Sequence, residues 1–149
     1  NLWIFGGGFL PGLGPRRLAR GIELDMVLLR PDGSVHVVEL KRARVPVLTH
    51  QRDKTVPANE VHRAVAQVVN YTVTLDETAP GWTANGIDLR RASGTVVIGH
   101  PAFEPVQDEE ALNRALRVCN SHLARIEVIT YKRLMAGARR ALDLQTDQV

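Results

Sequence analysis

The residues Pro31, Asp32 and Gly33 lie between two apolar segments and constrain how those segments can pair. A type I turn favours proline at its second position, and the left-handed residue that follows it in a hairpin favours glycine. The motif therefore predicts a three-residue hairpin loop that is closed by Arg30 opposite Ser34. This loop length fixes the register of the two flanking strands, because a slip of one residue would turn every side chain to the other face.

Charged residues face one another in this register. Asp25 falls opposite Glu39, and Glu23 falls opposite Lys41. All four side chains share one face because strand side chains alternate. Opposed Cβ atoms lie about 4.5–5.5 Å apart, so two carboxylates placed in this way destabilise the pair unless something neutralises them. A divalent cation would neutralise Asp25 and Glu39.

Apolar residues on both faces predict that the hairpin is buried. Partly buried carboxylates need a partner or a metal. Burial therefore favours a functional site over an exposed charged hairpin, an alternative that the spacing of Glu39 and Lys41 leaves open. One face carries Ile22, Leu24, Met26 and Leu28, and the other carries Val27, Leu29, Val35 and Val37.

Asp25 followed by Glu39-x-Lys41 resembles the residue constellation of the PD-(D/E)xK nuclease fold. Carboxylate and carbonyl oxygens suit Mg²⁺ or Mn²⁺, so Asp25, Glu39 and the carbonyl of Leu40 would hold such an ion. Lys41 lies two residues after Glu39 and points to the same face. There it can orient or deprotonate an attacking water and offset the charge that grows on the phosphorane.

Residues 59–75 have the apolar periodicity of a helix, and Asn59 is a candidate N-cap. Glu60, Gln67 and Tyr71 form a second stripe along the edge of the apolar one, with the last two at i, i+4. A neutral amide and a phenol can touch the site there without competing for the metal. A boundary polar residue and an amphipathic core aromatic would give the same pattern. The predicted core stripe contains Val61, Ala64, Val65, Val68, Thr72 and Leu75.

In combination, Asp25, the ELK of residues 39–41 and the Q-x-x-x-Y of residues 67–71 resemble the nuclease domain of the Shedu family of bacterial antiphage defence proteins. The runs TVVIGHP at 95–101 and IEVITYKRLM at 126–135 resemble the remaining core strands and the last helix of that family. The likeness covers about residues 2–141. It implies metal binding at Asp25 and Glu39, catalysis by Lys41 and support from Gln67.

Nuclease relatives often carry a further acidic residue on a helix before the first strand. This chain begins at Asn1 without methionine. We therefore expect that helix to lie upstream or to be missing, and the chain to be the C-terminal part of a longer protein.

Residues 42–58 are the most polar stretch of the chain and directly follow the predicted site. A solvated loop is one interpretation of this stretch. In a nuclease, the same cations would lie along a DNA backbone. The candidate DNA-binding residues are Arg42, Arg44, Arg52 and Lys54.

Composition agrees with one enzyme-sized domain over residues 1–149, of which 44% are hydrophobic. Lysine and arginine number 19 against 16 acidic residues, an excess that permits nucleic-acid binding without requiring it. No apolar run is long enough to span a membrane. The single Cys119 fits a reducing cytoplasm. We expect DNA as the partner, no membrane, and a homo-oligomer, if one forms, through this or an upstream domain.

The remaining pattern predicts an α/β fold, with a mixed central sheet flanked by helices and a PD-(D/E)xK restriction-endonuclease-like core. Thr130 is a candidate cap for the last helix. The predicted elements are loops at 1–14 and 78–91, strands at 95–98 and 126–130, and helices at 108–123 and 131–144.

These observations predict a Mg²⁺- or Mn²⁺-dependent DNA endonuclease with Tyr71 and Glu23 in supporting positions. An alternative is a nuclease-fold module that has lost catalysis and binds nucleic acid or a protein. A small acid–base hydrolase that uses Glu23 and Lys41 would explain the hairpin but not Gln67.

Overall fold

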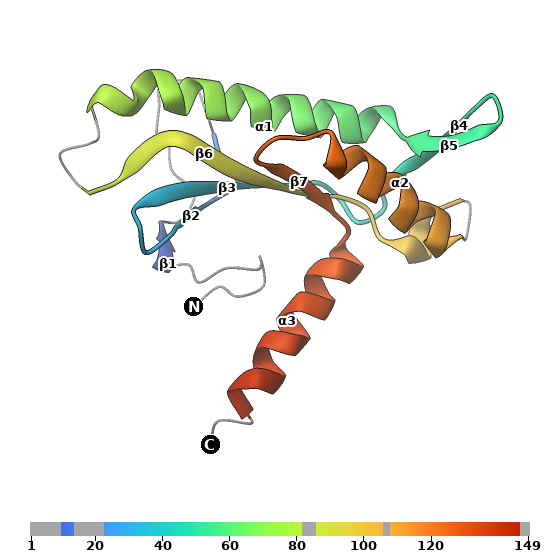
Figure 1. Cartoon of the computed structure of the whole chain (residues 1–149). Helices are drawn as coiled ribbons and strands as arrows, with labels where there is room; N and C mark the ends of the chain where they lie inside the picture. The colour runs from blue at the N-terminus through green and yellow to red at the C-terminus, as the bar shows by residue number, and fades with distance from the viewer. Residues whose placement is uncertain (1–9, 14–22, 82–85, 106–107, 147–149) are drawn as a thin grey trace.

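The computed structural model describes residues 10–13, 23–81, 86–105 and 108–146 (Figure 1). Within these residues a five-stranded mixed sheet has the order β1-β2-β3-β6-β7, and three α-helices flank it. The predicted α/β class is confirmed. The strands are β1 (Leu10–Leu13), β2 (Met26–Leu29), β3 (Ser34–Leu40), β6 (Asp88–Val97) and β7 (Ile126–Ile129), and the helices are α1 (Asn59–Thr78), α2 (Glu109–Ser121) and α3 (Tyr131–Thr146).

The hairpin of β2 and β3 has the predicted register. Val27 pairs with Val37, and the Arg30 N–H donates to the Ser34 carbonyl at 2.9 Å. Gly33 has a φ of 84°, which is the left-handed conformation that the bulged turn requires. The three-residue loop is therefore confirmed.

The regular pairing of β2 begins at Met26, and Asp25 forms a bend just before it. The predicted alternation fails at this bend. Leu24 packs in the same core as Val27, and not on the opposite face with Met26. A bend rotates the chain, so counting by twos does not carry across it.

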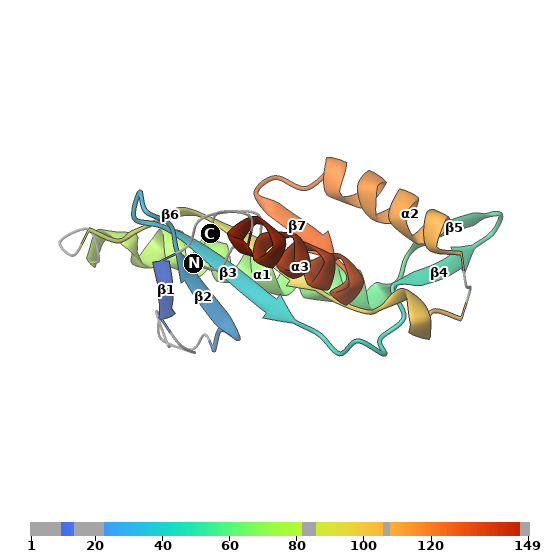
Figure 2. The ribbon, with the colours of Figure 1, turned by 90° about the horizontal axis from the view of Figure 1, so that it is seen from below.

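The two faces of the sheet are covered by different helices. Helices α1 and α2 pack on one face, where Val37, Val68 and Leu112 belong to a single core. Helix α3 crosses the other face, where Leu134 packs against a smaller cluster that contains Val38 (Figures 1 and 2). Side chains of β3 therefore alternate between the α1 side and the α3 side. In the part of the chain that the structure describes, no helix is long and apolar enough to cross a membrane.

Helix α1 carries the predicted core stripe, but its start differs from the prediction. Ala58 is the N-cap and makes no side-chain capping hydrogen bond, so the prediction of Asn59 as a cap was wrong. The Ala58 N–H donates to the Val47 carbonyl at 2.8 Å, which ties the helix start to the preceding segment by main-chain contact. The predicted cap Thr130 is confirmed, since its hydroxyl accepts the Arg133 N–H at 3.3 Å.

Two predicted loops contain strands. The segment predicted as loop 78–91 includes the start of β6. This part of the strand contains polar residues such as Asp88 and Arg90, so its sequence lacks the apolar pattern that predicts a strand. Arg91 has a φ of 56° and donates its N–H to Asp76 at 2.7 Å, so β6 is irregular where its sequence is polar. The predicted loop 1–14 contains β1, while residues 1–9 and 14 lie outside the described part of the chain.

The predicted basic loop at 42–58 contains a hairpin of β4 (Leu48–Gln51) and β5 (Lys54–Pro57), joined by a two-residue turn. The buried carboxylate of Glu104 accepts the main-chain N–H of Val47 at 2.6 Å and of Leu48 at 3.4 Å. These bonds hold the base of the hairpin against the segment that follows β6.

Candidate active site

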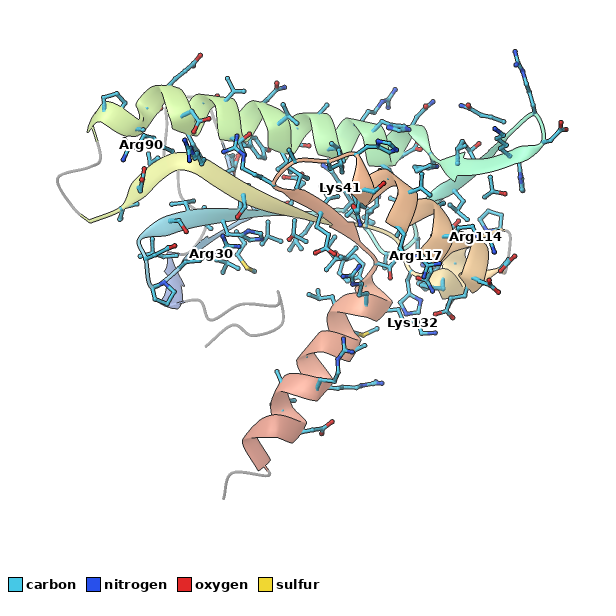
Figure 3. The ribbon with its side chains drawn as sticks, in the orientation of Figure 1. Arg30, Lys41, Arg90, Arg114, Arg117 and Lys132 are labelled. Atoms are coloured by element: carbon cyan, nitrogen blue, oxygen red, sulfur yellow. The ribbon has the colours of Figure 1, made fainter. Side chains whose placement is uncertain are left out.

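The predicted site lies at the C-terminal end of β3, beneath α1 (Figure 3). Glu39 is buried within β3, and Lys41 follows the last residue of the strand. The Lys41 N–H donates to the Val97 carbonyl at 2.8 Å, so the main chain still pairs with β6 at this point. The lysine is thereby held firmly although it stands outside the strand.

The Lys41 ammonium bridges a carboxylate and an amide. Its Nζ lies 2.6 Å from Glu39 Oε1 and 2.9 Å from Gln67 Oε1. The Glu39 side chain is 4% exposed and the Lys41 side chain 32%. The carboxylate is therefore shielded from solvent, whereas the lysine is partly accessible to it. An ammonium group has three donors. Two of them are used here, and the third is not engaged by a described residue.

Gln67 is fixed at both ends of its amide. Its oxygen accepts from Lys41, and its nitrogen donates to the Tyr71 hydroxyl one turn later on α1. Burial raises the pKa of Tyr71 above its usual value, the Gln67 hydrogen bond opposes this, and the charges of Glu39 and Asp25 raise the pKa further. Tyr71 is therefore a neutral phenol at neutral pH, and its own O–H remains a donor.

The second oxygen of Glu39 is buried, and no described residue provides it with a hydrogen bond. A buried carboxylate oxygen without a partner is costly, and such groups are rare in folded proteins. A cation bound at this oxygen would remove that cost. Carboxylate oxygens such as this one are the kind of ligand that Mg²⁺ and Mn²⁺ prefer.

Asp25 stands at the edge of the same cluster. Its Oδ2 accepts the Leu40 N–H at 2.8 Å, which joins the residue before β2 to the end of β3. The charge of Asp25 contributes to the raised pKa of Tyr71 and also to that of Tyr131, whose main cause is burial. Asp25, in the bend before β2, thus lies beside the end of β3, where Glu39 is placed. Within the described residues, no group of three or more acidic, histidine or cysteine side chains is arranged for a metal.

Two placements were not foreseen from the sequence. Glu23 is exposed before β2, and no hydrogen bond or ion pair joins it to Lys41 among the described residues, so the predicted Glu23–Lys41 pairing was wrong. The bend at Asp25 ends the ladder before that pair can form. Tyr131, at the start of α3, is a neighbour of Asp25 that no local pattern marks.

The four candidate DNA-binding residues are exposed and fall into two groups. Arg42 and Arg44 follow Lys41 directly. Arg52 and Lys54 lie at the tip of the hairpin of β4 and β5.

Fold and site together define an α/β domain with a half-buried acid–lysine–amide cluster at one end of its mixed sheet. The chain belongs to the Shedu family, because the family described as Shedu protein SduA, C-terminal, matches residues 1–135. The predicted resemblance is confirmed, and this membership implies a role in antiphage defence. No curated protein matches the chain.

Proposed function

We propose that this chain is a metal-dependent nuclease domain that hydrolyses DNA phosphodiesters in antiphage defence. The observation that carries the proposal is the half-buried cluster in which Lys41 bridges Glu39 and Gln67, while the second oxygen of the buried Glu39 has no partner among the described residues. A surface ion pair would leave neither a buried unpaired oxygen nor a lysine held from two sides. The mixed sheet and the order of Asp25, Glu39 and Lys41 support a PD-(D/E)xK core.

Asp25, Glu39 and the Leu40 carbonyl would hold one Mg²⁺ or Mn²⁺ ion. When bound, this ion would polarise the phosphate and lower the pKa of a coordinated water. Lys41 would direct its third N–H toward the phosphate and offset the negative charge that develops on the phosphorane. The amide of Gln67, locked by Tyr71, would keep the ammonium from turning away.

Positively charged side chains outside the cluster are candidate contacts for the DNA backbone. Arg42 and Arg44 adjoin Lys41, and the tip of the hairpin adds Arg52 and Lys54. We propose these four residues as phosphate contacts, since exposed arginine and lysine provide most of the affinity for DNA without reading its sequence.

Cleavage of plasmid and linear DNA by wild type and Lys41→Ala tests the proposal. Wild type should cleave with Mg²⁺ or Mn²⁺ and not after chelation. Lys41→Ala should lose cleavage while its DNA affinity stays within about threefold, because the lysine acts mainly on the transition state. Salt-dependent DNA binding without cleavage by wild type would instead favour a nuclease-fold binding module.

A further inference from the structure

Arg44, His100 and Phe103 form a cluster that the proposed mechanism does not use, called here the stacking cluster. Phe103 ends a short 3₁₀ helix, η4 (Pro101–Phe103), and is 46% exposed. The Arg44 guanidinium carbon lies 5.1 Å from the centre of the Phe103 ring. The His100 ring meets the same ring edge to face, with centres 6.0 Å apart.

Local hydrogen bonds hold the main-chain segment that carries the aromatic ring. His100 Nδ1 accepts the Ala102 N–H at 3.1 Å, and the His100 carbonyl accepts the Phe103 N–H at 2.9 Å. Arg44 covers part of the ring, but nearly half of Phe103 still faces solvent. An aromatic ring that contacts two neighbouring side chains and remains about half exposed offers a surface for a flat ligand.

Main-chain bonds place the stacking cluster next to the candidate active site. The Gly99 N–H donates to the Arg42 carbonyl at 3.3 Å, and the Lys41 N–H donates to the Val97 carbonyl. The segment that carries Lys41 therefore runs beside the segment that leads to His100. Three residues of chain span at most about 11 Å, so Arg44 lies within about three nucleotide steps of Lys41 at a rise of about 3.4 Å each.

We propose that the stacking cluster binds one unpaired nucleobase of the DNA strand beside the phosphodiester that is cleaved. Bases stack on aromatic rings and on guanidinium planes regardless of sequence, and arginine adds attraction for the neighbouring phosphates. The proposal rests on the proposed nuclease function for the position of the cleaved bond. It makes a strand with at least one unpaired base the preferred substrate.

Single-stranded oligonucleotides that carry the fluorescent base 2-aminopurine at successive positions test this inference. They are mixed with Lys41→Ala protein, so that the strand stays intact. We expect quenching at one position. In that background Phe103→Ala should abolish the quenching and weaken single-strand binding by about 5- to 150-fold, the range of one lost base–aromatic stack. Binding of a blunt duplex should change by less than about twofold.

Control variants separate stacking from folding. Phe103→Trp should retain quenching and affinity, and Val118→Ala, at an exposed apolar residue on α2, should behave as the parent protein. Phe103→Leu keeps an apolar side chain without a ring. Parental quenching in Phe103→Leu, equal loss of single-strand and duplex binding in Phe103→Ala, or no binding of single strands would overturn the inference.

The two proposals fail in different ways, because fluorescence and affinity need no cleavage. Position-specific quenching by a chain whose wild type cleaves no DNA would refute the nuclease and keep the nucleobase site. Metal-dependent cleavage without any quenched position would refute the nucleobase site alone.

Discussion

Lys41 is held by two acceptors, so its ammonium group has lost much of the freedom that a surface lysine has. The restraint also limits the directions in which the third N–H of the ammonium group can point. A positioned donor stabilises developing charge better than a mobile one, because no reorganisation is needed during the reaction. In the proposed site, Gln67 and Tyr71 would therefore act by positioning Lys41 and not by binding the metal.

At Asp25 we expect a metal response that Asp25→Asn removes. The asparagine oxygen can still accept the Leu40 N–H, but the charge that attracts the ion is gone. In wild type, Mn²⁺ at 100 times its Kd should stabilise the fold by about 2.7 kcal/mol, which is about 5–10 °C in Tm for a domain of this size. Without metal, Asp25→Asn should melt slightly higher than wild type because repulsion between carboxylates is relieved.

Thermal melts with and without Mn²⁺ measure this response. Glu39→Gln serves as a second variant, because it also removes one charge from the same cluster. An equal Mn²⁺ shift in wild type and both variants would place the ion elsewhere.

His36 makes stability depend on pH from the face opposite Glu39. Its ring nitrogens lie 2.7 Å from Ser93 Oγ and 3.0 Å from Thr95 Oγ1. Burial, and to a smaller extent the Arg30 charge, lower the pKa of His36 from 6.5 to about 4. His36 is therefore protonated below about pH 6.5 in the unfolded chain, but only below about pH 4 in the folded protein.

The free energy of unfolding should consequently fall as the pH drops from 6.5 to 4, by about 3 kcal/mol from this residue. Urea unfolding of wild type and His36→Gln at several pH values isolates the effect, since both proteins share all other titrating groups. Parallel curves for the two proteins would show that His36 is not the cause.

At the scale of elements, Gly94 lets α1 approach the sheet closely. A Cβ at residue 94 would lie 2.5 Å from Val68 Cγ1 and 3.1 Å from Val37 Cγ2. Val68 is adjacent to Gln67, so the depth of α1 on the sheet also sets the distance from Gln67 to Lys41. Packing in the core and geometry in the site are therefore coupled through one helix.

We expect Gly94→Ala to destabilise the protein by about 1–3 kcal/mol through overpacking, and to lower cleavage by displacing Gln67. Val68→Ala removes the clashing methyl groups, so the double variant should be more stable than the sum of the single effects predicts. Denaturant unfolding of the four proteins gives this coupling. Strict additivity would mean that a side chain at residue 94 does not destabilise the protein through contact with Val68.

At the scale of the whole molecule, the candidate active site lies at the end of β3, and the hairpin of β4 and β5 follows this end in the sequence. Glu104 ties the hairpin base to the segment after β6, and Lys41 is tied to β6 itself. The hairpin and the candidate active site are therefore both attached to β6 and the segment that follows it. We therefore expect DNA that is bound at the proposed site to contact the hairpin tip as well.

Neutralising Arg52 and Lys54 should weaken DNA binding similarly for unrelated sequences and reduce the log–log salt slope by up to about 0.9 per lost phosphate contact. The matched control neutralises Arg139 and Arg140, two exposed residues of α3, which gives the same change in net charge. Affinity measured over a range of salt concentrations compares the two. Equal effects of both pairs would show that only net charge matters.

Sequence patterns were enough to predict the register of the central hairpin, the core stripe of α1 and the α/β class. These features depend on local rules: the turn residues Pro31 and Gly33 fix the loop, and alternation or helical periodicity fixes the buried faces. The family motifs are equally local, because Glu39 and Lys41 share a face in any strand.

The bend at Asp25, the polar start of β6 and the long-range neighbours of the site depend on tertiary packing. The bend at Asp25 separates Glu23 from Lys41, and β6 begins in polar residues that only its pairing with β3 makes a strand. Tyr131 and Phe103 reach the neighbourhood of the site through packing between segments far apart in the chain. Such contacts depend on which surfaces cover one another, and no local spacing encodes that because burial is a property of the whole fold.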